Sequence, residues 1–378
     1  MSCPPASRWA WAEIDLDALA HNVDVLQGTV APAAVWAVVK ADAYGHGADA
    51  VAAAAVAAGC EGLCVALTAE GVALRSAGIE APILVLSEQP AEHAPTIVAH
   101  RLTPTVTTAA GIEALAALAP DGLAVHLKID TGMHRIGAAP ADAGALVGLI
   151  AARAPHLRLA GVFTHLAVAD EPADPYTAEQ LDRFADALAA LPSGALDGVA
   201  VHAANSAGAL AHPRARHSFV RAGIALYGIS PGPDVDALVT DLRPVLALKA
   251  RVSFVKRLAA GQRLSYGLRH TVGADTNVAT VPLGYADGVR RGLSSNGDVL
   301  IGGRRRPIIG TITMDQLMVD CGDDPVQRGD EVVLIGGQGG DRITAEEWGA
   351  RLDTIGYEVV CGIGARVPRL LVGGARHP

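Results

Sequence analysis

Apolar runs rich in β-branched residues alternate with alanine-rich stretches over the first two-thirds of the chain. Short apolar runs between turn residues predict buried strands, and longer alanine-rich stretches predict helices. The predicted strands span 35–39, 63–67, 83–86, 102–106, 124–129, 159–163, 199–203 and 219–222. The predicted helices span 48–58, 68–77, 110–118, 141–153 and 177–191. Eight strands alternating with helices are typical of a TIM-like (β/α)8 barrel, although a doubly wound parallel sheet has the same local pattern.

The pattern changes near Asp241, where the alanine-rich helical stretches end. Strand-like segments follow at 245–255, 277–283, 299–301, 307–319 and 331–335, with one predicted helix at 345–352. Glycines punctuate these segments, which is typical of a mostly β domain. We therefore expect an α/β barrel domain over 12–240 and a β-barrel-like domain over 241–378.

The length and composition allow two domains but not a membrane span. The chain has 378 residues, and alanine supplies much of the 51% apolar content. The longest apolar stretch, 51–59, is about half the roughly 20 residues that a spanning helix needs. The N-terminus lacks the basic and apolar pattern of a secretion signal. We expect a cytoplasmic protein with no membrane partner.

Charge and cysteine usage exclude other classes. The formal net charge is −9, and the only basic cluster, Arg304–Arg306, is better explained by a solvated turn than by a nucleic-acid surface. The number of cysteines, five, is odd, and no two of them form a C-x-x-C pair, so neither a disulfide framework nor a zinc site is expected. No nucleic-acid partner and no metal are predicted.

Polar side chains follow five of the predicted strands, at the barrel edge where catalytic groups lie. These side chains are Lys40; His126, Lys128, Asp130 and Arg135; Thr164 and His165; His202, Asn205 and Ser206; and Arg221, which Gly223 follows. One polar residue at a strand end is common, but five such ends together would be rare in a purely structural barrel.

Lys40 directly follows the apolar strand VWAVV. A partly desolvated lysine loses its proton more easily and can attack a carbonyl group. The alternative is a lysine that merely extends to water. Tyr44 and the glycines of YGHG follow at once and predict a tight loop close to a ligand.

Ser206 and the glycine-bearing turn RAGIALYG follow the last two barrel strands, where barrels often bind phosphate. A reactive lysine together with a phosphate site indicates pyridoxal phosphate. Arg221 must be held by hydrogen bonds or an ion pair, and it would donate to a pyridine ring without losing its proton. Alternatively, Ser206 is a plain helix N-cap.

The histidines have simpler interpretations. His165 and His202, each taken alone, would more often be satisfied core histidines. His46, His93 and His100 are expected at the surface.

In the second domain, tyrosines stand in the glycine turns Ser265–Gly267 and Gly284–Gly288, and an MDQ triplet occupies Met314–Gln316. By physical argument alone these are turns and strand ends. Their spacing does not show whether they reach the barrel.

The motifs together resemble the alanine racemase family, and the resemblance runs nearly end to end. The matching segments are AEIDLDALAHN, VVKADAYGHG, HLKIDTGMHRIG, GVFTHLAVAD, HAANSAGAL, VRAGIALYG, LSYGLRH, LGYADG, GTITMDQLMVD and GYEVVCGIGARVPR. The resemblance implies a barrel, a β domain that residues 1–11 join, pyridoxal 5'-phosphate, and a head-to-tail homodimer with two composite sites. It also implies interconversion of L-alanine and D-alanine, supplying D-alanine for peptidoglycan.

The resemblance also implies roles for individual residues. Lys40 would hold the cofactor and act as one base, and Tyr266 of the partner subunit would be the other. The remaining cofactor contacts would be Arg221 at the pyridine nitrogen, His165 beside the ring, and Tyr44, Ser206, Gly223, Ile224 and Tyr357 at the phosphate. The substrate site would comprise Arg135, Tyr285, Met314 and Asp315, and Lys128 occupies the position that many relatives carbamylate.

The chain departs from the family pattern in three places. Thr313 stands where relatives often have Cys or Ser, Asp42 stands where Asn is common, and GLRHTV follows Tyr266 in place of a more aromatic segment. Thr313 leaves fine substrate preference open, so a racemase of serine or of broader specificity is the main alternative. A cofactor carrier, a decarboxylase with the same domains and an aldolase without pyridoxal phosphate are weaker alternatives. A visible absorbance band would exclude the aldolase, and carbon dioxide release would identify the decarboxylase.

Overall fold

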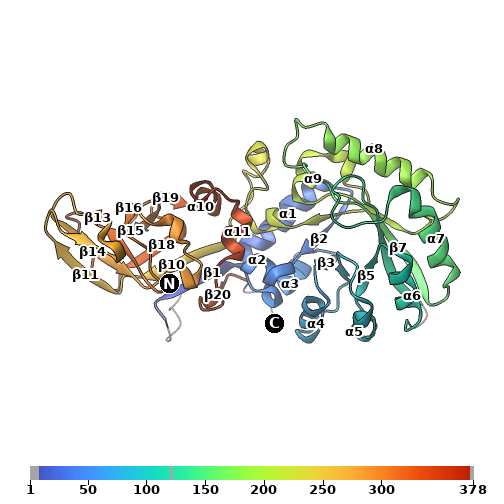
Figure 1. Cartoon of the computed structure of the whole chain (residues 1–378), viewed down its shortest axis with the longest axis horizontal. Coiled ribbons are helices and arrows are strands. Elements are labelled where there is room, and N and C mark those ends of the chain that lie inside the picture. The colour runs from blue at the N-terminus through green and yellow to red at the C-terminus, as the bar shows by residue number, and fades with distance from the viewer. Residues whose placement is uncertain (1–7, 120–121, 375–378) are drawn as a thin grey trace. The chain divides into compact units, whose positions relative to one another are not determined.

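The computed structural model describes residues 8–119 and 122–374 (Figure 1). The described residues form two compact units. The barrel unit comprises residues 19–43, 48–119 and 122–242, and the β unit comprises residues 8–18, 44–47 and 243–374. None of the helices in this part of the chain combines the length and apolar character that a membrane span requires.

The barrel unit is built on eight parallel strands, as the sequence predicts. They are β2 (Ala34–Val38), β3 (Gly62–Val65), β4 (Ile83–Val85), β5 (Thr103–Val106), β6 (Leu123–Lys128), β7 (Leu157–Phe163), β8 (Ala200–His202) and β9 (Phe219–Ala222). Their order is β8-β7-β6-β5-β4-β3-β2-β9, so the last strand in the chain pairs with the first. Backbone bonds from Ser218 N to Val201 O (2.9 Å) and from Arg221 N to Ala204 O (3.0 Å) link β8 with β9. The nearly closed barrel is confirmed, and the doubly wound sheet is excluded.

Helices follow the barrel strands and lie on their outer side (Figure 1). They are α3 (Ala48–Ala57), α4 (Thr68–Ser76), α5 (Ala94–Ala99), α6 (Ala109–Ala116), α7 (Ala143–Ala152), α8 (Tyr176–Ala189) and α9 (Ser206–Ala211). The five predicted helices are present, whereas the short α5 and α9 and the N-terminal α1 (Leu16–Val30) were not predicted. A helix of six residues contains too few apolar residues at helical spacing to be recognised, so α5 and α9 could not be predicted from periodicity.

The segment α2 (Lys40–Gly45) is a left-handed turn directly after β2. Ala41, Asp42, Ala43 and Tyr44 have φ values of +53°, +53°, +53° and +54°, and Gly45 follows at +80°. This conformation costs roughly 1–2 kcal/mol per residue for L-amino acids, and only glycine, Asn and Asp adopt it readily. Four consecutive non-glycine residues in it therefore need external stabilisation.

The β unit contains a sheet whose strands are mostly antiparallel. Its main strands are β1 (Ala10–Asp15), β10 (Leu246–Arg251), β11 (Phe254–Leu258), β14 (Thr276–Val281), β15 (Asp298–Ile301), β16 (Arg304–Ile309), β17 (Leu317–Asp320), β18 (Glu331–Gln338) and β20 (Arg369–Val372). The sheet order is β11-β14-β17-β16-β15-β18-β10-β1-β20. Helix α10 (Ala345–Leu352) occupies the predicted span. The mostly β character is confirmed; residues 1–7, also predicted to join it, lie outside the described residues.

Three details of the β unit correct the sequence prediction. The segment 245–255 is two strands because the chain changes partner at Val252 and Ser253, from β18 to β14. The segment 307–319 is also two strands, since Gly310 (φ +70°) ends β16 and the MDQ turn follows. Arg304–Arg306 lies in β16 rather than in a turn, and its charges meet carboxylates such as Asp324, Asp341 and Glu347.

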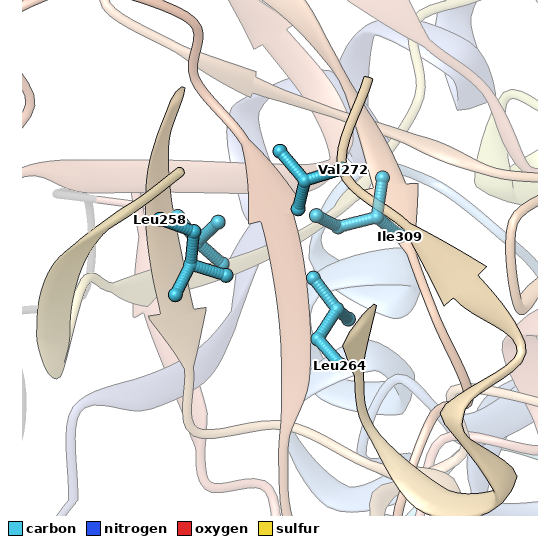
Figure 2. Close-up of a cluster of buried hydrophobic side chains, with 5 residues drawn as sticks. Leu258, Leu264, Val272 and Ile309 are labelled. Carbon is cyan, nitrogen blue, oxygen red and sulfur yellow. The ribbon is translucent and has the colours of Figure 1, made fainter. Parts of the chain in front are cut away.

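A hydrophobic cluster anchors the hairpin that carries Tyr266. The hairpin consists of β12 (Arg263–Leu264) and β13 (His270–Thr271). Figure 2 shows side chains of the cluster, which consists of Leu258, Leu264, Val272, Val278 and Ile309, with Met318 packed against it. Burial of such side chains fixes the hairpin to the sheet. The turn between the two hairpin strands is therefore anchored by this cluster.

Candidate active site

Arg221 on β9 is 2% exposed and lies at the centre of the barrel-unit site. Its Nη1 bonds to His202 Nδ1 (2.7 Å), and its Nη2 donates to the carbonyl oxygens of Thr164 (2.9 Å) and Ala203 (2.8 Å). Burial lowers its pKa to about 10, so the group remains a cation at neutral pH. Among the described residues no carboxylate bonds to it, and its Nε has no acceptor. A buried cation with an N–H left over is suited to a ligand that accepts a hydrogen bond.

A chain of histidines supports Arg221. A guanidinium only donates, so His202 accepts at Nδ1 and carries its proton on Nε2. That Nε2–H then donates to His126 Nδ1 at 3.0 Å. Burial, followed by the charge of Arg221, lowers the pKa of His126 to about 3 and that of His202 well below its usual range. Both rings are therefore neutral, and their tautomers are fixed by the arginine.

His202 and His126 are packed in the barrel interior. The His202 ring stacks on Phe163 and Phe219, with centroid distances of 4.5 Å and 4.1 Å. A Cβ on Gly161 would overlap the His126 ring, so the glycine makes room for it. His202 is thus a satisfied core histidine, as expected, but it also holds the arginine.

Lys40, Lys128 and Arg135 surround the same strand ends as Arg221. Lys128, at the end of β6, is 5% exposed. Burial lowers its pKa to about 8, with further lowering by the charges of Arg221, Arg135 and Lys40 and an opposing effect of Asp130. Four cations acting together against one carboxylate favour an anionic ligand, or an anionic modification, at this position.

His165 follows β7 beside this group. Its Nδ1 lies 3.3 Å from Arg221 Nη2. Burial lowers its pKa well below the usual range, and the charge of Arg221 adds to the effect. The structure thus brings His165 next to the guanidinium as a neutral ring.

Ser206 joins the two loops that follow β8 and β9. The N-cap of α9 is Asn205, whose side chain accepts from Gly208 N at 2.9 Å, so the plain N-cap interpretation of Ser206 is wrong. Ser206 Oγ instead accepts from Gly223 N (2.9 Å) and Ala225 N (3.2 Å), at the start of the 3₁₀ turn Ile224–Tyr227. Ser206, Gly223 and Ile224 therefore lie together, in the loops where barrels bind phosphate.

In the β unit, hydrogen bonds connect the turns that carry Tyr266, Tyr285 and Met314. Thr311 donates to Tyr266 O (3.0 Å), and Ser265 Oγ donates to Thr311 O (2.7 Å). Tyr285 N and Ala286 N donate to the carbonyl oxygens of Thr313 (3.0 Å) and Met314 (3.1 Å).

These three side chains form the tyrosine face, defined as Tyr266, Tyr285 and Met314. Their exposed fractions are 74%, 43% and 52%. Large exposed apolar side chains on connected turns are typical of a surface that meets a ligand or another chain.

Asp287 and Asp315 lie in one ion-pair network of the β unit. Asp287 is fully buried and accepts two bonds from Arg8 (2.8 and 2.6 Å) and one from Gly284 N (3.0 Å). Arg366 lies 3.4 Å from Asp287 and donates to Asp315 at 2.7 Å. Asp315 is therefore tied to the turn that bears Tyr285 by an ion pair. Asp287 was not among the predicted site residues, although an acid between the glycines of LGYADG could have signalled it.

Tyr44 and Tyr357 meet within the β unit, with ring centroids 6.1 Å apart. Arg369 holds the backbone directly after Tyr44 by donating to Gly45 O from Nε (3.0 Å) and Nη2 (2.9 Å). His46 is fully buried, and its Nδ1 bonds to Tyr44 O at 2.9 Å, so its predicted surface position is wrong.

The predicted site residues thus fall into two groups. The barrel unit holds Lys40, Lys128, Arg135, His165, Ser206, Arg221, Gly223 and Ile224, and the β unit holds Tyr44, Tyr266, Tyr285, Met314, Asp315 and Tyr357. In the part of the chain that the structure describes, no group of three or more His, Cys, Asp or Glu side chains is arranged to hold a metal ion.

The strand ends of this (β/α)8 barrel bring together two lysines, a buried arginine and a loop that bonds to Ser206. These features are typical of a barrel enzyme that binds an anionic ligand. Comparison with known proteins identifies the family. The chain matches the family model of the alanine racemase N-terminal domain over residues 14–231 and that of the C-terminal domain over residues 245–371. The chain belongs to the alanine racemase family, whose members are isomerases.

Individual relatives agree over nearly the whole chain. An alanine racemase of Symbiobacterium thermophilum is 48% identical, covering 97% of this chain and 98% of its own. The solved alanine racemase of Streptomyces coelicolor A3(2) has a TM-score of 0.90 at 41% identity, covering 96% of this chain and 98% of its own. That of E. faecalis has a TM-score of 0.91 at 37% identity, covering 97% of this chain and 99% of its own.

Proposed function

We propose that the protein interconverts L-alanine and D-alanine with pyridoxal 5'-phosphate as cofactor, working as a homodimer. The observation that carries this proposal is the buried Arg221, which has no carboxylate partner among the described residues and an Nε–H without an acceptor. A pyridine nitrogen is an acceptor of the required kind, because it takes a hydrogen bond from a group that keeps its own proton.

The donor set of the barrel unit fits the other parts of this cofactor. Lys40 would hold it covalently through its amine, and His165 would lie beside the ring. Ser206, Gly223 and Ile224 would hold the phosphate. The bound cofactor supplies an electron-withdrawing ring that acidifies the Cα–H of an attached amino acid.

Two bases would move the Cα proton. Lys40 would act on one face of Cα and Tyr266 of the partner subunit on the other, so that neither has to cross the substrate. Exposure of Tyr266 on the tyrosine face supports such a role in a second chain. Arg221 keeps its own proton, which limits protonation of the ring and side reactions that depend on it.

Arg135 would bind the substrate carboxylate, and Met314 and Tyr285 of the partner subunit would complete the substrate site. Asp315, predicted to take part, would act through its ion pair with Arg366. We also propose that Lys128 is carbamylated. Its pKa of about 8 leaves more neutral amine at neutral pH than an ordinary lysine has, and only the neutral amine reacts with carbon dioxide.

A racemase of serine or of broader specificity is the second candidate, because Thr313 lies beside Met314. Thr313 Oγ1 donates to Gln316 O (2.9 Å) and accepts from Gln316 N (3.2 Å). Its hydroxyl is therefore engaged in its own turn, which supports alanine over a hydroxylated substrate. A cytoplasmic location, supply of peptidoglycan and the domain boundaries at 12–240 and 241–378 belong to the same proposal.

The test is Cα proton exchange followed by NMR in D2O, with optical rotation read in parallel. Purified protein and pyridoxal phosphate are mixed separately with L-alanine, D-alanine, L-serine and L-lysine. We expect exchange with loss of optical activity, fastest on alanine. Fastest turnover of serine would establish the second candidate, and no exchange despite a visible absorbance band would overturn the racemase proposal.

A further inference from the structure

Glu70 uses its two carboxylate oxygens for different segments of the barrel unit. Oε2 accepts from Ala66 N (2.8 Å) and Leu67 N (3.0 Å), which lead into α4, the helix that contains Glu70 itself. Oε1 accepts from Ala41 N at 2.7 Å. One oxygen thus caps its own helix, and the other reaches the residue after Lys40.

The N–H of Ala41 belongs to the peptide plane that joins Lys40 to Ala41. A hydrogen bond to this N–H fixes that plane and with it the backbone ψ angle of Lys40. Ala41 also begins the run of positive φ angles in α2. The first N–H groups of a helical turn have no acceptor inside the turn, so they need an acceptor from elsewhere in the chain.

Asp42 acts at the other end of the same turn. Its Oδ1 accepts from Ala48 N (2.7 Å) at the start of α3, and Asp is one of the residue types that tolerates the left-handed conformation. Asp42 thus ties α2 to the following helix. Glu70 is the acidic side chain that ties it at the Lys40 end.

We propose that Glu70 is a positioning residue for Lys40. Its carboxylate holds the strained turn α2 in register at the end of β2 and so fixes the backbone from which the Lys40 amine extends. The positioning of the turn follows from the geometry alone, and only its consequence for the cofactor rests on the proposed function.

Two substitutions remove the acceptor oxygens of Glu70 in steps. Glu70→Gln keeps one acceptor oxygen and replaces the other by an NH2 group, which cannot accept from an N–H. The variant can therefore satisfy α4 or Ala41, but not both. Glu70→Ala satisfies neither.

Glu88 offers a matched control in the same barrel. Its carboxylate accepts from the backbone N–H groups of Thr107 and Thr108 and from the Thr108 hydroxyl (2.7 Å), next to α6. Glu88→Gln thus makes the same change to a carboxylate that accepts from the backbone of another loop, with no bond to α2.

The experiment compares Glu70→Gln, Glu70→Ala, Glu88→Gln and the unmodified protein by hydrogen exchange of residues 40–47 without added cofactor. A second readout is the rate at which pyridoxal phosphate dissociates from the loaded protein, followed by visible absorbance. We expect exchange at Ala41–Tyr44 to rise at least about tenfold in Glu70→Ala, since a charge-assisted bond is lost, and to rise less in Glu70→Gln, whose single oxygen can still accept from Ala41. We expect dissociation to accelerate in the same two variants, with Glu88→Gln unchanged in both readouts.

Unchanged exchange at 41–44 in Glu70→Ala would overturn the inference, as would an equal increase in Glu88→Gln. Faster exchange with unchanged cofactor dissociation would overturn the link to Lys40. If the unmodified protein binds no pyridoxal phosphate, the proposed function fails, whereas the exchange comparison still decides whether Glu70 holds the turn.

Discussion

At the scale of single residues, the barrel unit places a cation where no carboxylate of the described chain meets it. Arg221 is held by neutral acceptors, namely two carbonyl oxygens and His202. Neutral acceptors leave the positive charge uncompensated and therefore available to a ligand. Hydrogen bonds run from Arg221 to His202 and from His202 to His126, so two side chains of the core support the guanidinium.

Replacement of His202 tests this support. His202→Phe removes the acceptor of a buried charged donor, and we expect a loss of roughly 2–3 kcal/mol in the free energy of unfolding. His126→Phe removes only the acceptor of a neutral N–H, so we expect a loss of roughly 1 kcal/mol. Urea unfolding of both variants measures the difference, and equal losses would contradict it.

The lowered pKa of Lys128 predicts a pH-dependent stability. Between the folded pKa of about 8 and the ordinary value near 10.5, the unfolded chain binds the proton and the folded chain does not, so stability rises with pH. Relative to Lys128→Met, the unmodified protein should gain about 1 kcal/mol between pH 7 and pH 9. Urea unfolding in carbonate-free buffer checks this, and a constant difference between the two proteins would show that the pKa is not lowered.

Removal of the Tyr266 hydroxyl tests the two-base proposal. Tyr266→Phe should lose about a hundredfold or more in racemisation, equally in both directions because the two enantiomers have equal free energy. Exchange of the Cα proton should fall by a similar factor for one enantiomer and far less for the other, since only one face of Cα loses its base. Exchange at Cα in D2O, measured separately from L-alanine and D-alanine, gives both rates. Small and equal effects on both would contradict the assignment.

At the scale of elements, the left-handed turn α2 is the most unusual feature of the chain. Its six residues lie between β2 and α3 and include Lys40 near the strand end. Its conformation is unfavourable for alanine, so the bonds of Glu70 and Asp42 compensate for a local cost. The β unit uses comparable short connections, where the turns of the tyrosine face bond to one another.

Glycine should be tolerated better than alanine in this turn. Ala41 is exposed and has a φ of +53°, so Ala41→Gly should stabilise the protein by up to about 1 kcal/mol. The matched substitution Ala53→Gly, inside the right-handed helix α3, should instead cost about 0.5–1 kcal/mol. Thermal unfolding of the two variants should therefore shift in opposite directions, and a shared sign would contradict the strain argument.

At the scale of the whole molecule, the proposed function divides catalysis between two chains. The tyrosine face exposes Tyr266, Tyr285 and Met314 on turns that one bonded network holds together. A head-to-tail pair with two-fold symmetry would build two equivalent sites, each with Lys40 from one chain and Tyr266 of the partner subunit.

Subunit mixing tests this division. Lys40→Ala and Tyr266→Phe should each be strongly impaired as pure dimers, whereas a mixed dimer contains one intact site. Equal mixing with random exchange should restore about a quarter of the unmodified activity, since half of the dimers are mixed and each has one of two sites intact. Racemisation measured after mild dissociation and reassociation gives the result, and no recovery despite proven subunit exchange would contradict composite sites.

The sequence by itself determined most of the elements and the identity of the chemical groups. The barrel strands and α10 were predicted because buried strands and amphipathic helices have periodic patterns. Lys40, Arg221 and Ser206 were recognisable because charged or hydroxyl groups at or near the ends of apolar strands are rare without a reason. The order of the motifs along the chain indicated one protein family, and the comparisons confirmed that family.

Only the tertiary structure decided what these groups contact. Pattern reasoning missed the left-handed α2, the cap exchange between Asn205 and Ser206, and the burial of His46, since each depends on neighbours distant in sequence. It also missed Glu70, which looks like any acidic residue in the first turn of a helix. The direction of a carboxylate oxygen is set by the packing of whole strands and helices, so local periodicity carries no information about it.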